Sequence, residues 1–246
     1  MRKYFEYPFN ETVREDLLEY YQQYETESKG MHTGNHMDKI KLKIKRMQKH
    51  VTVEPTDTIL DVGCSEGGFI YEMANHCKLG IGMDISEPLI AKLSVNCPTE
   101  GTIRFESFDG VNIGYENTFD KVFMFDVLEH AFDPDALTES VWKCLKPSGL
   151  LVIQVPTTGW LSESIFGKYH MGHLRYYDDK YLCNYLEQFG FDVKAVDVYN
   201  SVPFSSKFIK YPLLYRMLDF SCSIMPSTLF PYFGSVMAVA QRKERG

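Results

Sequence analysis

The sequence lacks several features that would by themselves define its class. Its 246 residues contain no internal repeat and no low-complexity segment, which argues against repeat architectures, collagen-like chains and disordered chains. The six cysteines form no C-x-x-C pair and no cysteine and histidine cluster with zinc-finger spacing. We therefore expect free thiols in a reducing compartment, and a cytoplasmic location.

Long apolar runs and an excess of positive charge are also absent. The N-terminus has no apolar segment of the secretory type, and the most apolar stretch, residues 211–233, is interrupted by Arg216 and Asp219. Neither secretion nor a membrane span is expected. The formal net charge of −7 disfavours a nucleic acid partner. The apolar share of 44% is ordinary for a globular enzyme-sized chain.

Short β-type runs alternate with helix-length segments after Pro55. This alternation predicts βαβ units and an α/β fold with a mostly parallel sheet. Two more β-type runs follow, separated by a long insert. The predicted strands are 58–62, 79–83, 103–105, 121–125, 150–155, 191–199 and 236–243, and the predicted helices are 68–77, 88–96, 134–145 and 178–189.

The two remaining segments are an N-terminal arm, residues 1–50, and an aromatic-rich insert, residues 200–235, within the main domain of residues 51–246. Met37, Ile40, Ile44 and Met47 follow helical spacing, although the run from Ile40 would also suit a strand. We prefer a helix whose lysines are solvated. The insert is typical of an acceptor-site lid or an interface, such as that of a homodimer; a membrane-surface anchor is an alternative.

A glycine-rich turn follows the first strand of the main domain, in the run ILDVGCSEGG at 59–68. Such a turn presents backbone N–H groups and a helix N-terminus to a ligand. Asp84 lies 21 residues beyond Gly63, where an acid reaches ribose hydroxyls in such folds. The second glycine of a dinucleotide-binding turn is here Ser65, and Asp61 would repel a phosphate but pair with an ammonium group. An amino-acid-bearing nucleoside is therefore favoured over NAD.

At this point the sequence resembles the class I S-adenosylmethionine-dependent methyltransferases. The matching pieces are ILDVGCSEGG, GMDIS, the FDG at 108–110, FDKVFMFDVLEH and LKPSGLLVIQVP. They extend the resemblance over about residues 55–200 and again 235–243. It implies a Rossmann-like fold with a seven-stranded sheet, helices on both faces and an antiparallel last strand. Ser65 and Ser148 stand where the family more often has glycine.

The resemblance also implies a binding site for S-adenosylmethionine, which is released as S-adenosylhomocysteine. It further implies that the helical N-terminal arm, residues 1–50, closes over the donor as a cap. The glycine turn would surround the methionine moiety, Asp84 the ribose, and the segment at 108–109 the adenine. Alternatives are that Asp84 caps a helix and that Asp109 only forms a turn. The residues implied in cofactor binding are Asp61, Gly63, Cys64, Ser65, Gly67, Asp84, Ile85, Phe108, Asp109, Asp126 and Val127.

Methyl transfer from a sulfonium needs alignment of the acceptor, and a base only where the acceptor must lose a proton. Glu129 and His130 follow the fourth strand, where open α/β sheets bind ligands. His173 lies in KYHMGHLRYYDD, beside Tyr169, His170 and Arg175. We expect His130, His173 and Glu129 to be catalytic. Alternatively, Glu129 holds the backbone, and His173 and Arg175 brace their loop by hydrogen bonds to the backbone. His130, His170 and His173 could bind a divalent ion together with an acid, but no spacing demands a metal, and none is expected.

These observations predict methyl transfer from S-adenosylmethionine to a hydroxyl or phenol of a small molecule by in-line displacement. Two alternatives remain open. One is an N-methyltransferase, which can dispense with a base. The other is a non-catalytic S-adenosylmethionine-binding module or partner-activating subunit, for which substitution of His130 and His173 would be harmless.

Overall fold

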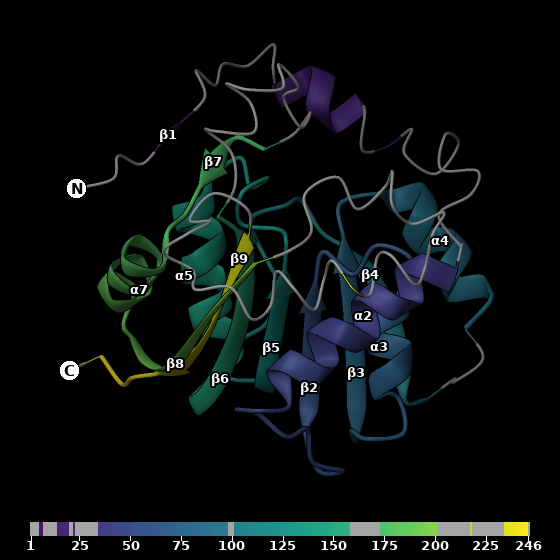
Figure 1. The fold of residues 1–246 in the computed structure, drawn as a ribbon. Coiled ribbons are helices and arrows are strands. Elements are labelled where there is room, and N and C mark those ends of the chain that lie inside the picture. Colours follow the sequence, from purple (N-terminus) through teal and green to yellow (C-terminus); the bar gives the residue numbers. More distant parts are fainter. Residues whose placement is uncertain are drawn as a thin grey trace.

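The computed structural model describes residues 5–6, 14–19, 22, 34–97, 101–157, 173–200, 217 and 234–245. Its centre is a seven-stranded sheet with the strand order β4-β3-β2-β5-β6-β9-β8 (Figure 1). The first five strands of that order pair in parallel, and β9 runs antiparallel between β6 and β8. The predicted fold class and the antiparallel last strand are confirmed.

All seven predicted strands are present, with ends that differ by a few residues. β6 differs most, because it begins at Leu145 rather than at 150 and includes the turn before the predicted run. The strands are β2 (Thr58–Val62), β3 (Leu79–Asp84), β4 (Ile103–Ser107), β5 (Phe119–Phe125), β6 (Leu145–Pro156), β8 (Phe191–Asn200) and β9 (Gly234–Arg242).

The predicted helices also form, and local sequence explains their starts. Asp133 and Asp178 cap the helices that follow them, each accepting a hydrogen bond from the backbone N–H three residues later. The segment from 37 is helical, so the strand alternative for it was wrong. The helices are α2 (Gly34–Met47), α3 (Gly68–Met73), α4 (Glu87–Val95), α5 (Pro134–Cys144) and α7 (Asp179–Gln188).

The sheet separates two apolar cores, because alternate residues of each central strand face opposite sides. Leu60 of β2 packs with the core that contains α5 and α7, whereas its neighbour Ile59 packs with α2 and α3. Helices therefore cover both faces, as predicted (Figure 1). Both neighbours are fully buried, which is why this strand reads as a continuous apolar run.

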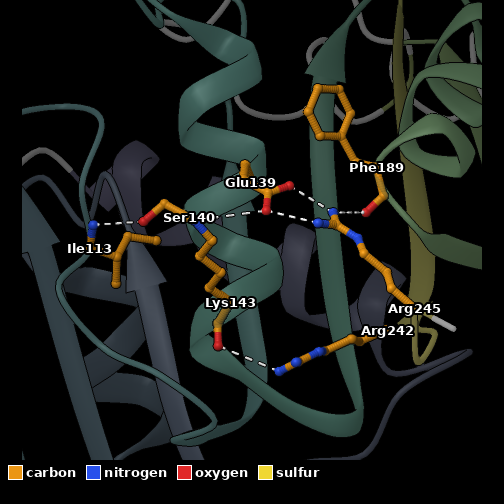
Figure 2. A network of polar contacts seen from close by, with 7 residues as sticks. All are labelled: Ile113, Glu139, Ser140, Lys143, Phe189, Arg242 and Arg245. Carbon is orange, nitrogen blue, oxygen red and sulfur yellow. Dashed lines mark hydrogen bonds and ion pairs between the residues drawn. The ribbon is translucent and has the colours of Figure 1, made fainter.

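The chain after β9 is fixed to α5 and to the end of α7 (Figure 2). Arg245 donates to both carboxylate oxygens of Glu139, at 2.8 and 2.7 Å, and to the backbone carbonyl of Phe189 at 2.8 Å. The guanidinium groups of Arg242 and Arg245 each lie 3.9 Å from the centroid of a Trp142 ring. These contacts connect the end of the described chain to both helices on this face of the sheet.

Two serines occupy backbone conformations that favour glycine. Ser65 has a φ of 48° and Ser148 a φ of 63°, so both lie in the left-handed region. These are the two positions at which the family that the sequence resembles more often has glycine. The departures therefore cost some local strain but leave both turns in place.

A short sheet connects the N-terminal arm to the main domain. β1 (Phe5–Glu6) pairs antiparallel with β7 (Arg175–Tyr176), which the sequence pattern did not predict. Residues 14–19 are helical, and Leu17 among them is buried. No helix in the described part of the chain is both long enough and apolar enough to cross a membrane. Most of the insert at 200–235 lies outside the described residues.

Candidate active site

The glycine-rich turn lies at the carboxyl end of β2 and is held by the end of β3. The backbone N–H groups of Gly63 and Cys64 both donate to the carbonyl of Met83, at 2.7 and 2.9 Å. Gly63 has a φ of 72°, and a Cβ there would lie 2.4 Å from Cγ2 of Val127. This close approach brings together two of the predicted cofactor-binding segments, the turn and the end of β5.

Asp84 stands at the end of β3 and accepts two backbone hydrogen bonds. Its Oδ2 accepts from Ser65 N at 2.9 Å and its Oδ1 from Ser86 N at 3.1 Å. Burial raises the pKa of its carboxyl above the usual value, while these hydrogen bonds lower it. Asp84 thus braces the glycine turn and the start of α4. It does so from the strand end at which the resemblance places the ribose.

The loop after β4 brings the residues predicted to flank adenine near one another. Phe108 donates its backbone N–H to the carbonyl of Asp84 at 3.3 Å, and a Cβ on Gly110 would lie 3.1 Å from Cδ1 of Ile85. Asp109 is exposed, and its Oδ1 accepts from Val111 N and Asn112 N at 2.9 and 2.6 Å. The alternative interpretation of Asp109, that of a turn-forming residue, therefore holds for this oxygen.

Two acids behave oppositely at the ends of β2 and β5. Burial raises the pKa of Asp61 to about 8, despite the opposing effect of Lys43. For Asp126, burial is outweighed by Lys43, Gln154 and His130, so that the pKa of its carboxyl lies below the usual value. The site therefore combines a carboxyl that is mostly protonated at neutral pH with one that is ionised.

Lys43 is a site residue that the sequence pattern did not predict. Its Nζ lies 2.6 Å from Oδ2 of Asp126, whose Oδ1 accepts from Gln154 Nε2 at 2.9 Å. The lysine-rich helix was interpreted as a solvated face. Lys43, however, lies three residues after Ile40 and four before Met47, both buried, and so stands beside the apolar stripe. This spacing was the feature of the sequence that could have predicted that Lys43 faces the site.

Cys64 is buried within the turn. Burial, together with Asp61 and Asp84, raises the pKa of its thiol well above the usual value. A neutral thiol is a poor nucleophile. Cys64 is therefore suited to packing within the turn rather than to reaction.

The predicted catalytic residues come together beyond β5. The rings of His130 and His173 meet edge to face with centroids 4.7 Å apart. Glu129 is fully buried, and its Oε1 lies 3.8 Å from Nε2 of His130. The backbone N–H of Leu174 donates to the carbonyl of Glu129 at 2.8 Å, which fixes the two segments together. The predicted residues Tyr169 and His170 lie outside the described part of the chain.

This cluster is electrostatically connected to the glycine-turn side of the site. Burial raises the pKa of Glu129 well above the usual value, and the nearby charge of Asp126 raises it further. Arg175 is buried, and its Nη1 donates to the carbonyl of Ala131. The predicted alternative, in which residues of this loop brace the backbone, thus applies to Arg175.

Two contacts bring the N-terminal arm to opposite sides of this site. Nε2 of Gln22 donates to the carbonyl of Ile85 at 3.0 Å, and the guanidinium of Arg14 lies 5.6 Å from the ring centroid of Phe132. Ile85 is on the predicted adenine side, whereas Phe132 follows His130. Neither contact was predicted.

The fold is that of the class I S-adenosylmethionine-dependent methyltransferases. Residues 18–196, more than half of the chain, match the sequence profile of the methyltransferase domain family. The chain belongs to that family, and its cofactor is S-adenosylmethionine.

Relatives and solved structures agree with this assignment. The chain is 28% identical over 155 residues to a phosphoethanolamine N-methyltransferase of Triticum aestivum, a match that covers 61% of this chain and 27% of that protein. It therefore spans about a quarter of the length of this relative. The solved complex of the Haloferax volcanii Trm112 activator and a putative methyltransferase superposes with a TM-score of 0.65, at 17% identity, over 86% of this chain and 95% of the other.

A second solved structure contains ligands. It is phosphoethanolamine N-methyltransferase 2 of Haemonchus contortus, in complex with phosphomonomethylethanolamine and S-adenosylhomocysteine. It superposes with a TM-score of 0.59 at 19% identity, over 85% of this chain and 53% of that chain. At this level of identity the likeness shows a shared fold.

Proposed function

We propose that this methyltransferase domain transfers the methyl group of S-adenosylmethionine to a hydroxyl or phenol of a small molecule. The observation that carries the proposal is the cluster of Glu129, His130 and His173. A hydroxyl acceptor must lose its proton as the new bond forms, and imidazole and carboxylate groups serve that purpose. An amine acceptor would not require them.

In this proposal the donor lies over the glycine turn. Asp61 pairs with its ammonium group, Asp84 with the ribose hydroxyls, and Ile85, Phe108 and Asp109 surround the adenine. Cys64, Ser65, Gly67, Asp126 and Val127 line the methionine side. The carboxyl ends of β2, β3 and β5 support this arrangement, because the segments that carry these residues contact one another there.

We also propose that residues 1–50 form a cap over the donor. The support is the pair of arm contacts, one from Gln22 to Ile85 and the other from Arg14 to Phe132. A cap excludes water from a reaction in which it would compete with the acceptor. The acceptor itself would enter between this arm and the histidine cluster.

A second candidate acceptor is an amine. The names of the Triticum aestivum and Haemonchus contortus proteins favour it, since both are phosphoethanolamine N-methyltransferases. An amine that is already neutral can attack the donor methyl without a base. The histidine cluster would then bind the acceptor rather than take its proton.

Transfer of label from methyl-labelled S-adenosylmethionine to matched pairs of acceptors distinguishes the two. Each pair shares one scaffold and carries either a hydroxyl or an amine, and phosphoethanolamine is tested alongside. The proposal predicts label in hydroxyl acceptors, reduced at least 100-fold by His173→Ala, with His76→Ala as an exposed histidine control. Label confined to amines would establish the second candidate instead, and His173→Ala should then raise the KM for the amine more than it lowers kcat.

A further inference from the structure

The described residues around Glu129 do not account for its burial. Its side chain is fully buried, and among the described residues neither of its carboxylate oxygens has a hydrogen-bond partner. Nε2 of His130 lies 3.8 Å from Oε1 of Glu129, beyond hydrogen-bond distance. A buried carboxyl group whose oxygens have no partner is unfavourable in either protonation state, and buried carboxylates are normally paired with a cation or coordinate a metal.

The two histidines supply the remaining ligands of such a metal. One donor atom from each of Glu129, His130 and His173 lies within 4.8 Å of the other two. Zinc-like ions bind imidazole nitrogen and carboxylate oxygen at about 2.0 to 2.2 Å, which sets their ligand atoms about 3 to 4 Å apart. Both imidazoles are partly exposed, so small rotations of their side chains bring the three atoms to that spacing.

Two hydrogen bonds hold the segment that carries Glu129 and His130 against the segment that carries His173. Leu174, the residue after His173, donates its N–H to the carbonyl of Glu129 at 2.8 Å. Arg175 donates to the carbonyl of Ala131, the residue after His130. The ligand set is thus fixed by contacts that do not use the ligand atoms themselves, as in metal sites that exist before the metal binds.

We propose that Glu129, His130 and His173 bind a divalent transition-metal ion that takes the acceptor oxygen at an open coordination position. Two imidazoles and a carboxylate without a thiolate suit zinc and neighbouring first-row ions. Three protein ligands leave room for one or more exogenous ligands. The sequence analysis expected no metal, because His173 is remote from the other two residues in the chain and the spacing does not require one.

The inference rests on the proposed function and states how the cluster removes the acceptor's proton. A metal ion lowers the pKa of a bound hydroxyl, whose proton leaves to water. The oxygen lone pair then attacks the donor methyl carbon. An O–CH₃ bond forms, the S–CH₃ bond breaks, and its electron pair returns to sulfur, leaving neutral S-adenosylhomocysteine.

Cobalt(II) titration of the full chain tests the site without the reaction. The chain is stripped with a chelator, and cobalt binding is followed by its visible absorption and by calorimetry, with zinc as competitor. We expect one cobalt per chain, with affinity reduced at least 100-fold in Glu129→Gln and in His173→Ala. His76→Ala, which removes an exposed histidine elsewhere, should bind cobalt normally.

S-adenosylhomocysteine binding by each variant is the second measurement. It should be unchanged in all three, which shows that they are folded. Absence of cobalt binding, equal binding in Glu129→Gln, or thiolate charge-transfer bands that place the metal on a cysteine would each overturn the metal site. Metal binding without any S-adenosylhomocysteine binding would leave the metal site standing and contradict the proposed function instead.

Discussion

Asp61 combines strong burial with a position at which a positive charge is expected to bind. Asp61 is only 3% exposed, and this burial raises the pKa of its carboxyl to about 8. In the free protein at neutral pH the carboxyl is therefore mostly protonated. An ammonium group of the donor would favour the ionised form, so donor binding should displace this proton.

We expect S-adenosylhomocysteine to bind more tightly as the pH rises from about 6 to 8, by up to about tenfold per unit. Binding at pH 7 should release a proton, which calorimetry detects as a binding enthalpy that differs between buffers of different ionisation enthalpy. Asp61→Asn should abolish both effects. Equal enthalpies in all buffers for the unmodified protein would show that Asp61 does not meet the ammonium group.

Asp61 should also reduce stability at high pH. Because its pKa is raised in the folded state, its contribution is favourable below the ordinary value of 3.8 and is lost as the pH rises through about 8. Asp61→Asn should therefore be more stable than the unmodified protein at pH 8, and this difference should disappear near pH 4. Urea unfolding at the two pH values measures it. A variant that is less stable at pH 8 would contradict this account.

The pKa of Asp126 is shifted in the opposite direction to that of Asp61, because Lys43 pairs with Asp126. After burial, Lys43 is the largest influence on the pKa of Asp126, which is lowered overall. The stabilisation that the ionised Asp126 contributes is fully present above pH 3.8, the ordinary pKa of an aspartate. It is lost as the pH falls through the lower pKa that Asp126 has in the folded protein. Since both side chains are partly exposed, Lys43→Met should lower the free energy of unfolding by about 1 kcal/mol at pH 7.

Lys45→Met is the matched control, because Lys45 is exposed on the same helix. Urea unfolding of both variants at pH 7 and pH 3 measures the difference, which should shrink at the lower pH. If Lys45→Met costs as much as Lys43→Met, the effect belongs to the charge of the helix and not to the pair with Asp126.

The glycine turn depends on the close approach of β2 and β5. In Gly63→Ala the new Cβ would lie 2.4 Å from Val127 and the backbone would keep a φ of 72°. We expect a loss of about 2 to 4 kcal/mol in the free energy of unfolding, since overpacking adds to the left-handed strain. Thermal or urea unfolding measures it.

Gly114→Ala separates these two costs. Gly114 has a φ of 75°, but a Cβ there would have nothing within 4 Å. It should therefore lose only about 1 to 2 kcal/mol, the cost of the backbone conformation alone. Adding Val127→Ala to Gly63→Ala should recover part of the loss. Equal losses for the two glycine variants would mean that Val127 moves aside freely.

Much of the sheet could be predicted because each central strand is a short apolar run between turn residues. The helices predicted from 134 and 178 begin at Pro134 and Asp179, and the structure explains both starts, because Asp133 and Asp178 cap them. The pairing of β1 with β7 and the approach of Arg14 to Phe132 were not predicted, because no short-range pattern links residues so far apart in the chain.

The site was predictable only in part, for a related reason. The glycine turn and its acids follow individual strands, and parallel strands end at one edge of the sheet. Lys43 comes from outside the sheet, and its role depends on how α2 packs. Glu129 is buried and lies near His173. This proximity depends on the path of the chain before β7, which the residue types alone do not specify.

The end of the described chain holds together two helices that are remote in sequence. Arg245 pairs with Glu139 of α5 and with the carbonyl of Phe189 after α7 (Figure 2). Because these side chains are partly exposed, Arg245→Met should cost only about 1 kcal/mol in the free energy of unfolding. Lys243→Met is the control, because Nζ of Lys243 lies 3.9 Å from the exposed carboxylate of Asp192, and it should cost less. Urea unfolding compares them, and equal effects would contradict a special role for Arg245.

The central claim is that the ends of β2, β3 and β5 form a donor site. Calorimetric titration with S-adenosylhomocysteine tests it most directly, with NAD as the competing nucleotide. We predict micromolar binding of S-adenosylhomocysteine, weakened at least about tenfold in Asp84→Ala through lost hydrogen bonds to a charged group, and no binding of NAD. Binding of NAD but not of S-adenosylhomocysteine would contradict the account.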